Sequence, residues 1–420
     1  MKNRKRMAVL ATLVLALVGT AAHAATSGSR FDATDFSNTN GSLTLTTETI
    51  TFNTDTLSYS IDGGAAVNAG EWAVSQSQDA GVGGNASIYD DVSVTMAMFN
   101  FDSLNIGSGA SIVVTGNAGI ALGSLGDMTI AAQISVKGAS GLGGSGGEGG
   151  SGAEGGKRKN YNATGNEAAL FTSDGSVSTA GDGGRDGNGG TQAQDGRGFG
   201  GGYRATSTDN GNGGGYGGLG GGDNDVGIGN WSANTYGDEE LTLLFGGSGG
   251  SGSQGAANTL DSNGGGGGGT IELTAIGTLT LDATLTVAGG KGRIGAATGT
   301  DRGSGGGSGG GILLNATDIV LTDSALLNAD GGDGGAGLGT NGGGGGGGRI
   351  AIYASDSLTI DGASIEDGAL ITDLDVAPAV TVAHGSAGTV TAGNGTLYIS
   401  IVPEPATMSL LALGGIAMLK

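Results

Sequence analysis

The chain has no cysteine, three prolines and two histidines among its 420 residues. Without cysteine it has no disulfide, no thiolate metal ligand and no cysteine nucleophile. His23 lies in the N-terminal leader, so a multi-histidine metal centre is excluded, and a Ser-His-Asp triad would have to contain His384. His384 is flanked by small residues and no nucleophile motif is near it, so we interpret it as an exposed turn residue. We therefore expect no enzyme activity and no catalytic residue.

Basic residues are also scarce. Lys and Arg number 17 against 39 Asp and Glu, which gives a formal net charge of −22. Nucleic acid is excluded as a partner, because its phosphates would be repelled by such a surface. An acidic surface favours solubility and a diffuse attraction for divalent cations.

Glycine is abundant instead, at 97 residues. The glycines have no Gly-X-Y period and proline is rare, so a collagen triple helix is excluded. Glycine at this level usually predicts disorder. Here the glycines form blocks that alternate with segments in which apolar and polar residues alternate, and this arrangement predicts the fold.

One set of six apolar positions occurs twice with a constant offset of 151 residues. The second set is Ile271, Leu273, Leu279, Leu281, Leu285 and Val287, and the first is Ile120, Leu122, Met128, Ile130, Ile134 and Val136. Alternation with period two marks strands that have one buried face. Three short strands in a unit of about 20 residues, repeated along the chain, predict an all-β fold: a right-handed parallel β-helix, or solenoid, with long glycine-rich loops.

Further segments follow the same pattern with a looser register. They are Ile312, Leu314, Ile319, Leu321 and Leu326; Ile350, Ile352, Leu358, Ile360 and Ile365; and, near the N-terminus, Leu43 to Ile61 and Val92 to Val114. The glycine blocks follow a third strand and end before the next first strand, so we expect them to leave one corner of the solenoid.

The expected organisation has five parts. They are a signal peptide at 1–24, N-terminal β-helix rungs at 25–137, a glycine-rich insertion at 138–269, C-terminal rungs at 270–400 and a sorting tail at 401–420. The insertion is either disordered or packed as extended polyglycine-type segments anchored by Tyr and Trp. Because a glycine backbone is entropically expensive to fix, we expect order only at its two ends.

The N-terminus has the pattern of a secretory signal peptide. Four basic residues precede the apolar stretch Ala8 to Val18, and Ala22-His23-Ala24 forms a small-x-small cleavage site. Cleavage between Ala24 and Ala25 would remove four positive charges and no acids, which moves the formal net charge from −22 to −26. The alternative is a buried N-terminal helix.

The C-terminus carries Pro403, Glu404 and Pro405, then the apolar run Thr407 to Leu419 and a final Lys420. This order resembles the PEP-CTERM sorting signal, which exosortase-type membrane proteases of Gram-negative, exopolysaccharide-making bacteria recognise. The resemblance implies an exosortase partner, transient membrane contact through the tail and delivery to the outer surface. The apolar run has 13 residues, whereas a membrane-spanning helix needs about 20. The alternatives to a sorting signal are a hydrophobic C-terminal strand and a truncated gene product, and the sequence permits either processing or retention of the tail.

Three internal segments extend the resemblance. Phe101 to Gly109, Tyr236 to Gly250 and Arg349 to Tyr353 look like parts of glycine-rich, β-helical surface proteins that bear PEP-CTERM tails. The resemblance implies a structural or adhesive protein of the surface or biofilm matrix, associated with exopolysaccharide. The alternative is a β-helix that binds or cleaves that polysaccharide. Carboxylates converging with Arg or Lys in a groove would favour the alternative, and a smooth face of Thr, Ser and Asn would favour the structural role.

Other candidate sites are weaker. The acidic pairs Asp90-Asp91, Asp238-Glu239-Glu240, Glu366-Asp367 and Asp373 with Asp375 lack a catalytic motif, so we interpret them as solvated. Calcium is the only cofactor that the sequence suggests, because Asp330 to Gly335 and Gly181 to Gly187 resemble oxygen-rich calcium-binding turns. Asp beside Gly is also common in ordinary turns, and this is the preferred interpretation.

Lys157-Arg158-Lys159 could contact an anionic polysaccharide but fits a solvated loop better. Two threonine rows, Thr44 to Thr51 and Thr278 to Thr286, suggest an ice- or glycan-binding face, or simply outward strand residues.

Overall fold

The computed structural model describes residues 33–35, 40–77, 92–141, 196, 198, 200–202, 210–222, 235–253, 263–293, 302–337, 341–365, 380–386 and 392–401. The fold is all-β: these residues form strands, a short 3-10 helix at Ala33–Asp35 and extended glycine-rich segments, with no α-helix among them. Both predicted cleavage residues, Ala24 and Ala25, and the motif Pro403, Glu404 and Pro405 lie outside the described residues.

Eleven strands precede the glycine-rich region. They are β1 (Ser42–Leu45), β2 (Thr49–Asn53), β3 (Ser58–Ile61), β4 (Val67–Asn68), β5 (Gly70–Ser77), β6 (Val92–Phe101), β7 (Ser103–Ile106), β8 (Ser111–Thr115), β9 (Gly119–Ser124), β10 (Met128–Ile130) and β11 (Ile134–Ser135). Eight follow it. They are β12 (Thr270–Leu281), β13 (Thr284–Thr286), β14 (Gly311–Leu321), β15 (Leu326–Asn328), β16 (Arg349–Ile360), β17 (Ala363–Ile365), β18 (Val380–Thr381) and β19 (Thr396–Ile401).

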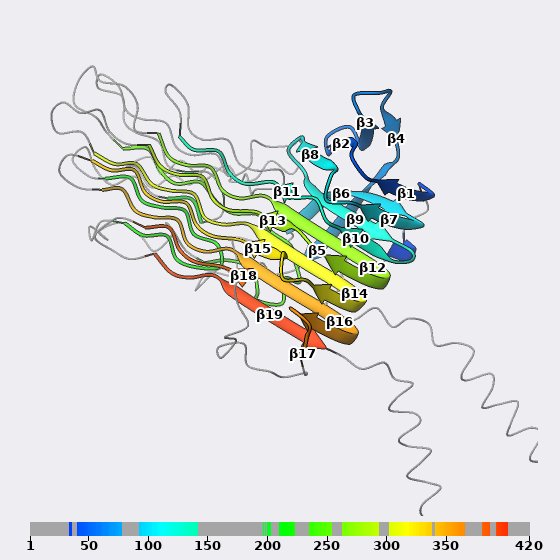
Figure 1. Cartoon of the computed structure of the whole chain (residues 1–420). Helices are drawn as coiled ribbons and strands as arrows, with labels where there is room; N and C mark the ends of the chain where they lie inside the picture. Colours follow the sequence, from blue (N-terminus) through cyan, green and yellow to red (C-terminus); the bar gives the residue numbers. More distant parts are fainter. Residues whose placement is uncertain are drawn as a thin grey trace, which may run out of the picture.

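The long strands β12, β14 and β16 stack side by side and in parallel (Figure 1). Each has a register irregularity near its middle, between Ala275 and Thr278 in β12. The first half of β12 continues the ladder to β9 and β6, and its second half pairs with β10 and, beyond it, β7. A third ladder joins β11, β13, β15 and β18. One passage of the chain therefore takes part in three parallel ladders: the first half of its long strand in the first ladder, the second half in the second ladder, and its short strand in the third.

The predicted repeat is confirmed where its offset is constant. Ile271 lies opposite Ile120, Leu279 opposite Met128 and Leu285 opposite Ile134 in neighbouring strands. The looser copies contain two errors. In β15 the residue in register with Leu285 is Leu327, which is fully buried, whereas the predicted Leu326 pairs with Thr284 and is half-buried.

The second error concerns Ile365, which does not begin a third strand of its passage. Asp361 and Gly362 both have positive φ, 49° and 76°, and form a two-residue reversal after β16. Strand β17 therefore folds back antiparallel on β16, with Ile365 opposite Leu358. The third-ladder strand of this passage is β18, where Val380 lies beside Leu327.

The N-terminal region, expected to consist of rungs alone, is mixed. Strands β1 and β2 pair in parallel with β7 and β8. By contrast, β2, β3 and β4 form an antiparallel meander, and β5 is antiparallel to β6. At this end of the stack the first ladder is therefore bordered by the reversed strand β5, whereas the second ladder ends in the parallel strand β1.

The glycine blocks form a hydrogen-bonded array, which we call the glycine array. It comprises the described residues 138–141, 200–202, 210–222, 246–253, 263–269, 288–293, 303–310, 329–335, 342–348, 382–386 and 392–395. Successive amides of 304–310 donate in turn to three different segments. The amides of 304, 307 and 310 bond 293, 290 and 287, those of 305 and 308 bond 251 and 248, and those of 306 and 309 bond 343 and 346. This period of three is that of an extended polyproline II-type helix.

Segment 303–310 also accepts hydrogen bonds from three further segments, 211–214, 265–268 and 332–335, so six neighbours surround it. Such close packing leaves no room for side chains between segments. A Cβ atom built on Gly307 would lie 2.0 Å from the Gly266 carbonyl oxygen, and one on Gly309 would lie 1.9 Å from that of Ala329. Glycine is required here because the backbones touch.

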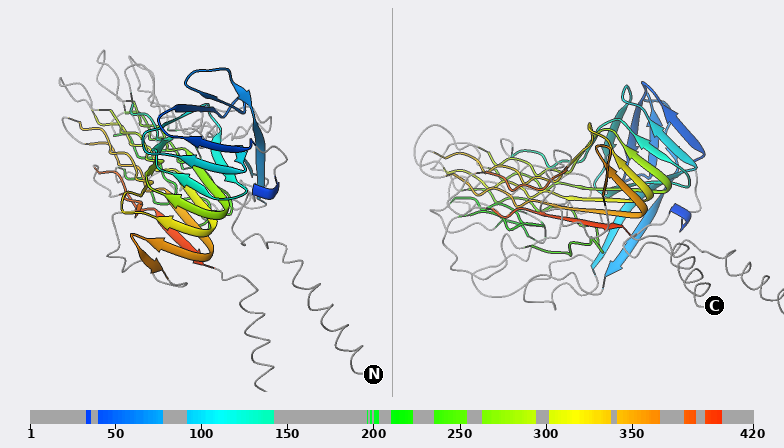
Figure 2. Two further views of the ribbon diagram at one scale, coloured as in Figure 1. Left: turned by 45° about the vertical axis from the view of Figure 1, so that its right-hand side comes forward. Right: turned by 60° about the horizontal axis from the view of Figure 1, so that its bottom comes forward.

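The array projects from one side of the strand stack (Figure 2), and its hydrogen bonds arrange the segments in three layers. The outer layer holds the outgoing segments that follow β11, β13, β15 and β18, and the middle layer holds the returning segments that lead into β12, β14, β16 and β19. The third layer comes from 200–202, 210–222 and 246–253, in the middle of the insertion. The expectation of order only at the ends of the insertion is therefore wrong. The polyglycine-type alternative describes these residues.

Two apolar clusters lie on opposite faces of the first ladder. The main core contains the inward residues of all three ladders, such as Ile271, Ile312 and Ile350. The second cluster contains Leu313 and Ala351 from the other face of the ladder, together with Tyr216, Tyr236 and Phe245 from the insertion. The first halves of the long strands are thus buried on both faces, which explains near-continuous apolar runs such as Gly311 to Leu314.

We expect Gly307→Ala to destabilise the fold by about 2 kcal/mol or more, because the added methyl group forces a backbone apart from its neighbour. The matched control is Gly107→Ala, whose Cβ would meet nothing closer than the Leu45 carbonyl oxygen at 3.3 Å. The measurement is the urea midpoint of each variant. Equal midpoints for the two variants would contradict the close-packed array.

Candidate functional site

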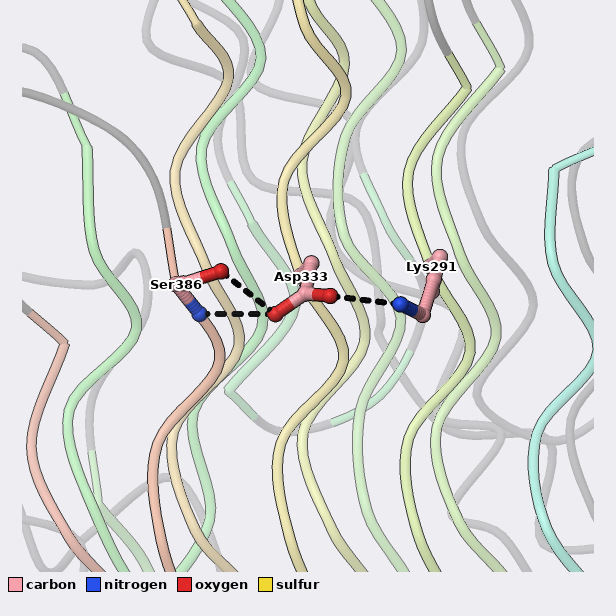
Figure 3. Close-up of polar contacts among 3 residues, drawn as sticks. All are labelled: Lys291, Asp333 and Ser386. Carbon is pink, nitrogen blue, oxygen red and sulfur yellow. Dashed lines mark hydrogen bonds and ion pairs between the residues drawn. The ribbon is translucent and has the colours of Figure 1, made fainter.

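The outer layer of the glycine array carries charged and polar side chains that contact one another across its segments. Because the segments repeat every three residues, side chains three positions apart project from the same side. Lys291, Asp333 and Ser386 come from three adjacent segments and lie in one row across this layer (Figure 3). Asp330, three residues before Asp333, lies one turn closer to the strands.

Asp333 bonds to both of its neighbours. Its Oδ2 accepts a hydrogen bond from Lys291 Nζ at 2.6 Å, and its Oδ1 accepts from the Ser386 amide at 2.9 Å and the Ser386 Oγ at 2.7 Å (Figure 3). Asp330 repeats the pattern, since its Oδ1 accepts from the amide of Ala383 at 2.7 Å. Both carboxylates therefore hold adjacent outgoing segments together.

The contacts of Asp333 set its protonation. Partial burial by itself would raise the pKa of this carboxyl, but the hydrogen bonds from Lys291 and Ser386 and the lysine charge outweigh it and lower the pKa to about 2. The same ion pair raises the pKa of Lys291, through its hydrogen bond to Asp333 first and the charge second. The pair is partly exposed, so its contribution to stability is below about 1 kcal/mol.

This geometry is that of a cross-link between segments. No group of three or more His, Asp or Glu side chains suitable for a metal ion occurs in the described ranges. Asp330 and Asp333, the described calcium candidates, bond instead to Ala383, Lys291 and Ser386. The other calcium candidate, Gly181 to Gly187, lies outside the described residues.

Arg349 joins the array to the sheet, and no pattern in the sequence predicts its burial. Its side chain is 5% exposed. Its Nε and Nη2 donate to the carbonyl oxygens of Tyr236 (3.2 Å) and Gly237 (3.3 Å), and Nη1 donates to Thr396 Oγ1 (3.0 Å). The guanidinium carbon lies 5.5 Å from the centroid of the Tyr216 ring, a cation–π distance.

The tyrosines of this cluster anchor the insertion through their hydroxyl groups. Tyr236 donates to the carbonyl oxygen of Gly246 at 2.5 Å and contacts Ser248 Oγ at 3.0 Å. Tyr353, from β16, donates to the Glu240 carbonyl oxygen at 2.5 Å. Tyr216 stacks on Tyr236 with ring centroids 4.7 Å apart. Of the aromatic residues scattered among the glycines, the described Tyr216 and Tyr236 thus help to fix the insertion against the sheet.

One further acid is buried that sequence reasoning missed. Glu272 in β12 is fully buried, although its position in the alternation predicts an outward side chain. Its register neighbours Ala121 and Leu313 belong to the second cluster, which covers this face of the ladder. Only knowledge that the insertion covers the sheet would have predicted the burial.

The other sequence candidates are not brought together. His384 is half-buried rather than exposed, and its Nδ1 lies 2.9 Å from the Gly385 carbonyl oxygen. The side chains of 238–240 are exposed, as expected. The acidic residues 90–91, 366–367, 373 and 375 and the basic run 157–159 lie outside the described part of the chain.

The threonine rows lie partly on one face of the second ladder. Adjacent strands place one side chain each in a row, and most of these are hydroxyl or amide side chains: Thr44, Asn105, Thr129, Thr280, Val320 and Thr359. Thr44 and Asn105 are exposed and the others are half-exposed. Beside this row Ser357 donates to Asp318 at 2.6 Å. The face is a smooth polar ladder and carries no Arg or Lys in this row.

The chain matches no protein-family model, no curated protein and no solved structure. Within the described residues no helix is long and apolar enough to cross a membrane.

We expect Asp333→Asn to lower stability at pH 7 by less than about 1 kcal/mol, because the ion pair is lost. The pKa of Asp333 is depressed in the folded state, so the wild-type advantage is full above the unfolded pKa, about 4, and is lost as pH falls through about 2. The measurement is the difference in thermal midpoint between variant and wild type at pH 7 and pH 2. The control is Asp323→Asn at an exposed position. A difference that persists at pH 2 would contradict the assignment.

We expect Arg349→Lys to destabilise the protein by about 2 kcal/mol, since an ammonium group cannot reproduce the planar fork that serves two carbonyl groups and Thr396. Thr396→Val removes one of those bonds and should have a smaller effect. Urea midpoints and the near-ultraviolet circular dichroism of the tyrosines are the measurements. An unchanged tyrosine signal in Arg349→Lys would mean that Arg349 does not order the cluster.

Proposed function

We propose that this protein is an exported structural or adhesive component of a bacterial surface layer or extracellular matrix, associated with exopolysaccharide and delivered by an exosortase-type system. In this proposal residues 1–24 direct export, and Pro403, Glu404 and Pro405 form the determinant that the membrane protease recognises. The apolar run after them makes a transient membrane contact.

The observation that carries the proposal is the glycine array. Its segments are held in three layers by backbone hydrogen bonds, and cross-linking side chains such as Asp333 reinforce the outer layer. Because backbone hydrogen bonds hold the segments, the array can be long and stiff although few of its positions need a particular side chain. Mechanical stiffness is useful to a matrix component. A carbohydrate-cleaving β-helix would instead need two carboxylates facing each other across a groove.

We also propose that the stacked strands are turns of a right-handed parallel β-helix. Each passage runs from a long strand through a short one, out into the array and back to the next long strand, and every strand pairs with its counterpart one passage later. The smooth Thr, Asn and Val row on the second ladder favours the structural role over a polysaccharide-cleaving one.

The test is the C-terminal mass of the native protein, measured from cells with and without their exosortase. We expect residues beyond about Pro405 to be missing only in cells that have the protease. An intact Lys420 in both kinds of cell would overturn the sorting assignment, and the surface-matrix proposal would lose its main support.

A further inference from the structure

The last strand of the first ladder, β19, has one edge that pairs with no strand in the described part of the chain. It pairs in parallel with β16 through residues 396–401. The Thr396 amide donates to the Gly348 carbonyl oxygen at 3.1 Å, which fixes the alternation along the strand. The amides and carbonyls of Leu397 and Ile399 therefore point away from β16, toward the open edge.

The apolar core also reaches this end of the stack. Ile350 and Ile352 in β16 are fully buried, whereas their register partners Leu397 and Ile399 in β19 are only partly buried. Val380 and Val382, next to the third ladder, are likewise partly buried. The part of the edge formed by Leu397 and Ile399, which pairs with no strand of the described residues, thus lies next to partly buried core side chains, and such an edge is a template for strand addition.

Charge restricts what can occupy this edge. The chain has a net charge of −22, yet no Asp, Glu, Lys or Arg occurs between Asp375 and Glu404 in the sequence. The described segments 380–386 and 392–401 thus carry no Asp, Glu, Lys or Arg of their own, and the carboxylates of Asp330 and Asp333 that contact them are bonded to Ala383 and Ser386. Two copies can meet there with less repulsion than elsewhere. Natural edge strands usually carry a charge or proline that prevents such pairing, and β19 has neither.

The opposite end of the stack differs. The first ladder ends there in β5, which runs antiparallel to β6, whereas the second ladder ends in β1, which is parallel to β7. A parallel head-to-tail continuation of the first ladder, with β19 of one copy following β6 of the next, is therefore blocked by β5. An association through β19 closes after two copies, as a two-fold interface does.

We propose that β19 is the dimer interface of this protein, where it pairs antiparallel with β19 of a second copy about a two-fold axis. The amides of Leu397 and Ile399 then donate across the interface, and the partly buried apolar side chains of both copies become one core. This inference does not depend on the surface-matrix proposal.

The first test is hydrogen exchange of the full native chain as a function of its concentration, read on peptides that span 396–401. We expect the Leu397 and Ile399 amides to become protected as the concentration rises, together with a doubling of mass in sedimentation equilibrium. Protection that is independent of concentration would mean that another segment of the same chain covers the edge. No protection, or a monomer at every concentration up to about 100 μM, would mean that the edge stays free. Either result overturns the proposal.

The second test is the matched pair Ser400→Glu and Ser400→Gln. Ser400 is half-exposed in β19, and the two substitutions have the same size but differ in charge. We expect Ser400→Glu to weaken the dimer at least about tenfold relative to Ser400→Gln, because two carboxylates are brought beside the shared strand pair. Equal dimerisation of the two folded variants would overturn the proposal. If neither variant folds, the exchange experiment on the wild type decides.

Discussion

The hydrogen bond between two glycine backbones at closest approach is the interaction on which the structure depends. Ordering a residue costs roughly 1–2 kcal/mol in backbone entropy, whereas a hydrogen bond returns a net 0.5–1.5 kcal/mol. An isolated glycine segment would therefore not stay ordered. In this protein each segment continues from a strand or leads into one, and the strands set the spacing of neighbouring passages. The strand core thus fixes the ends of the segments, and the six-neighbour packing of 303–310 then satisfies the amides between those ends.

The junction between the array and the sheet depends on a few large side chains. Arg349 bonds two carbonyl groups of the insertion and one strand residue, and the hydroxyl groups of Tyr236 and Tyr353 bond carbonyl groups of the 240–246 segment. These contacts bring the third glycine layer against the outward face of the first ladder. The covered face explains why Glu272 is buried in a strand whose alternation predicts exposure. Long-range packing, supplied by residues far along the chain, has overridden the local pattern.

Much of the strand stack could be predicted from the sequence, because its information lies in side chains. The constant offset of 151 residues placed Ile271 beside Ile120 and Leu285 beside Ile134, since parallel passages repeat their inward residues. The prediction failed at Leu326 and Ile365, where the spacing varied. The Asp361-Gly362 pair was a local signal for the reversal after β16 that was overlooked.

The glycine array and the row of Lys291, Asp333 and Ser386 could not be predicted in the same way. Glycine composition is compatible with disorder as well as with close packing, and no side-chain pattern assigns each segment its six neighbours.

In the glycine array, backbone hydrogen bonds determine the stiffness, whereas a different set of residues, the outward side chains, determines the chemistry of the surface. At inner positions such as Gly307 and Gly309 only hydrogen fits, so the sequence there is constrained by packing. At outward positions every third residue is free of that constraint, and here these positions carry Lys291, Asp330 and Asp333, which add cross-links without altering the backbone packing. The outer face can therefore change in charge or polarity while the layers beneath keep their geometry. A protein that must stay rigid while its surface adapts to a polysaccharide or to other copies would gain from this division. In a conventional core the same side chains fill the interior and set the strand register, so packing and sequence change together.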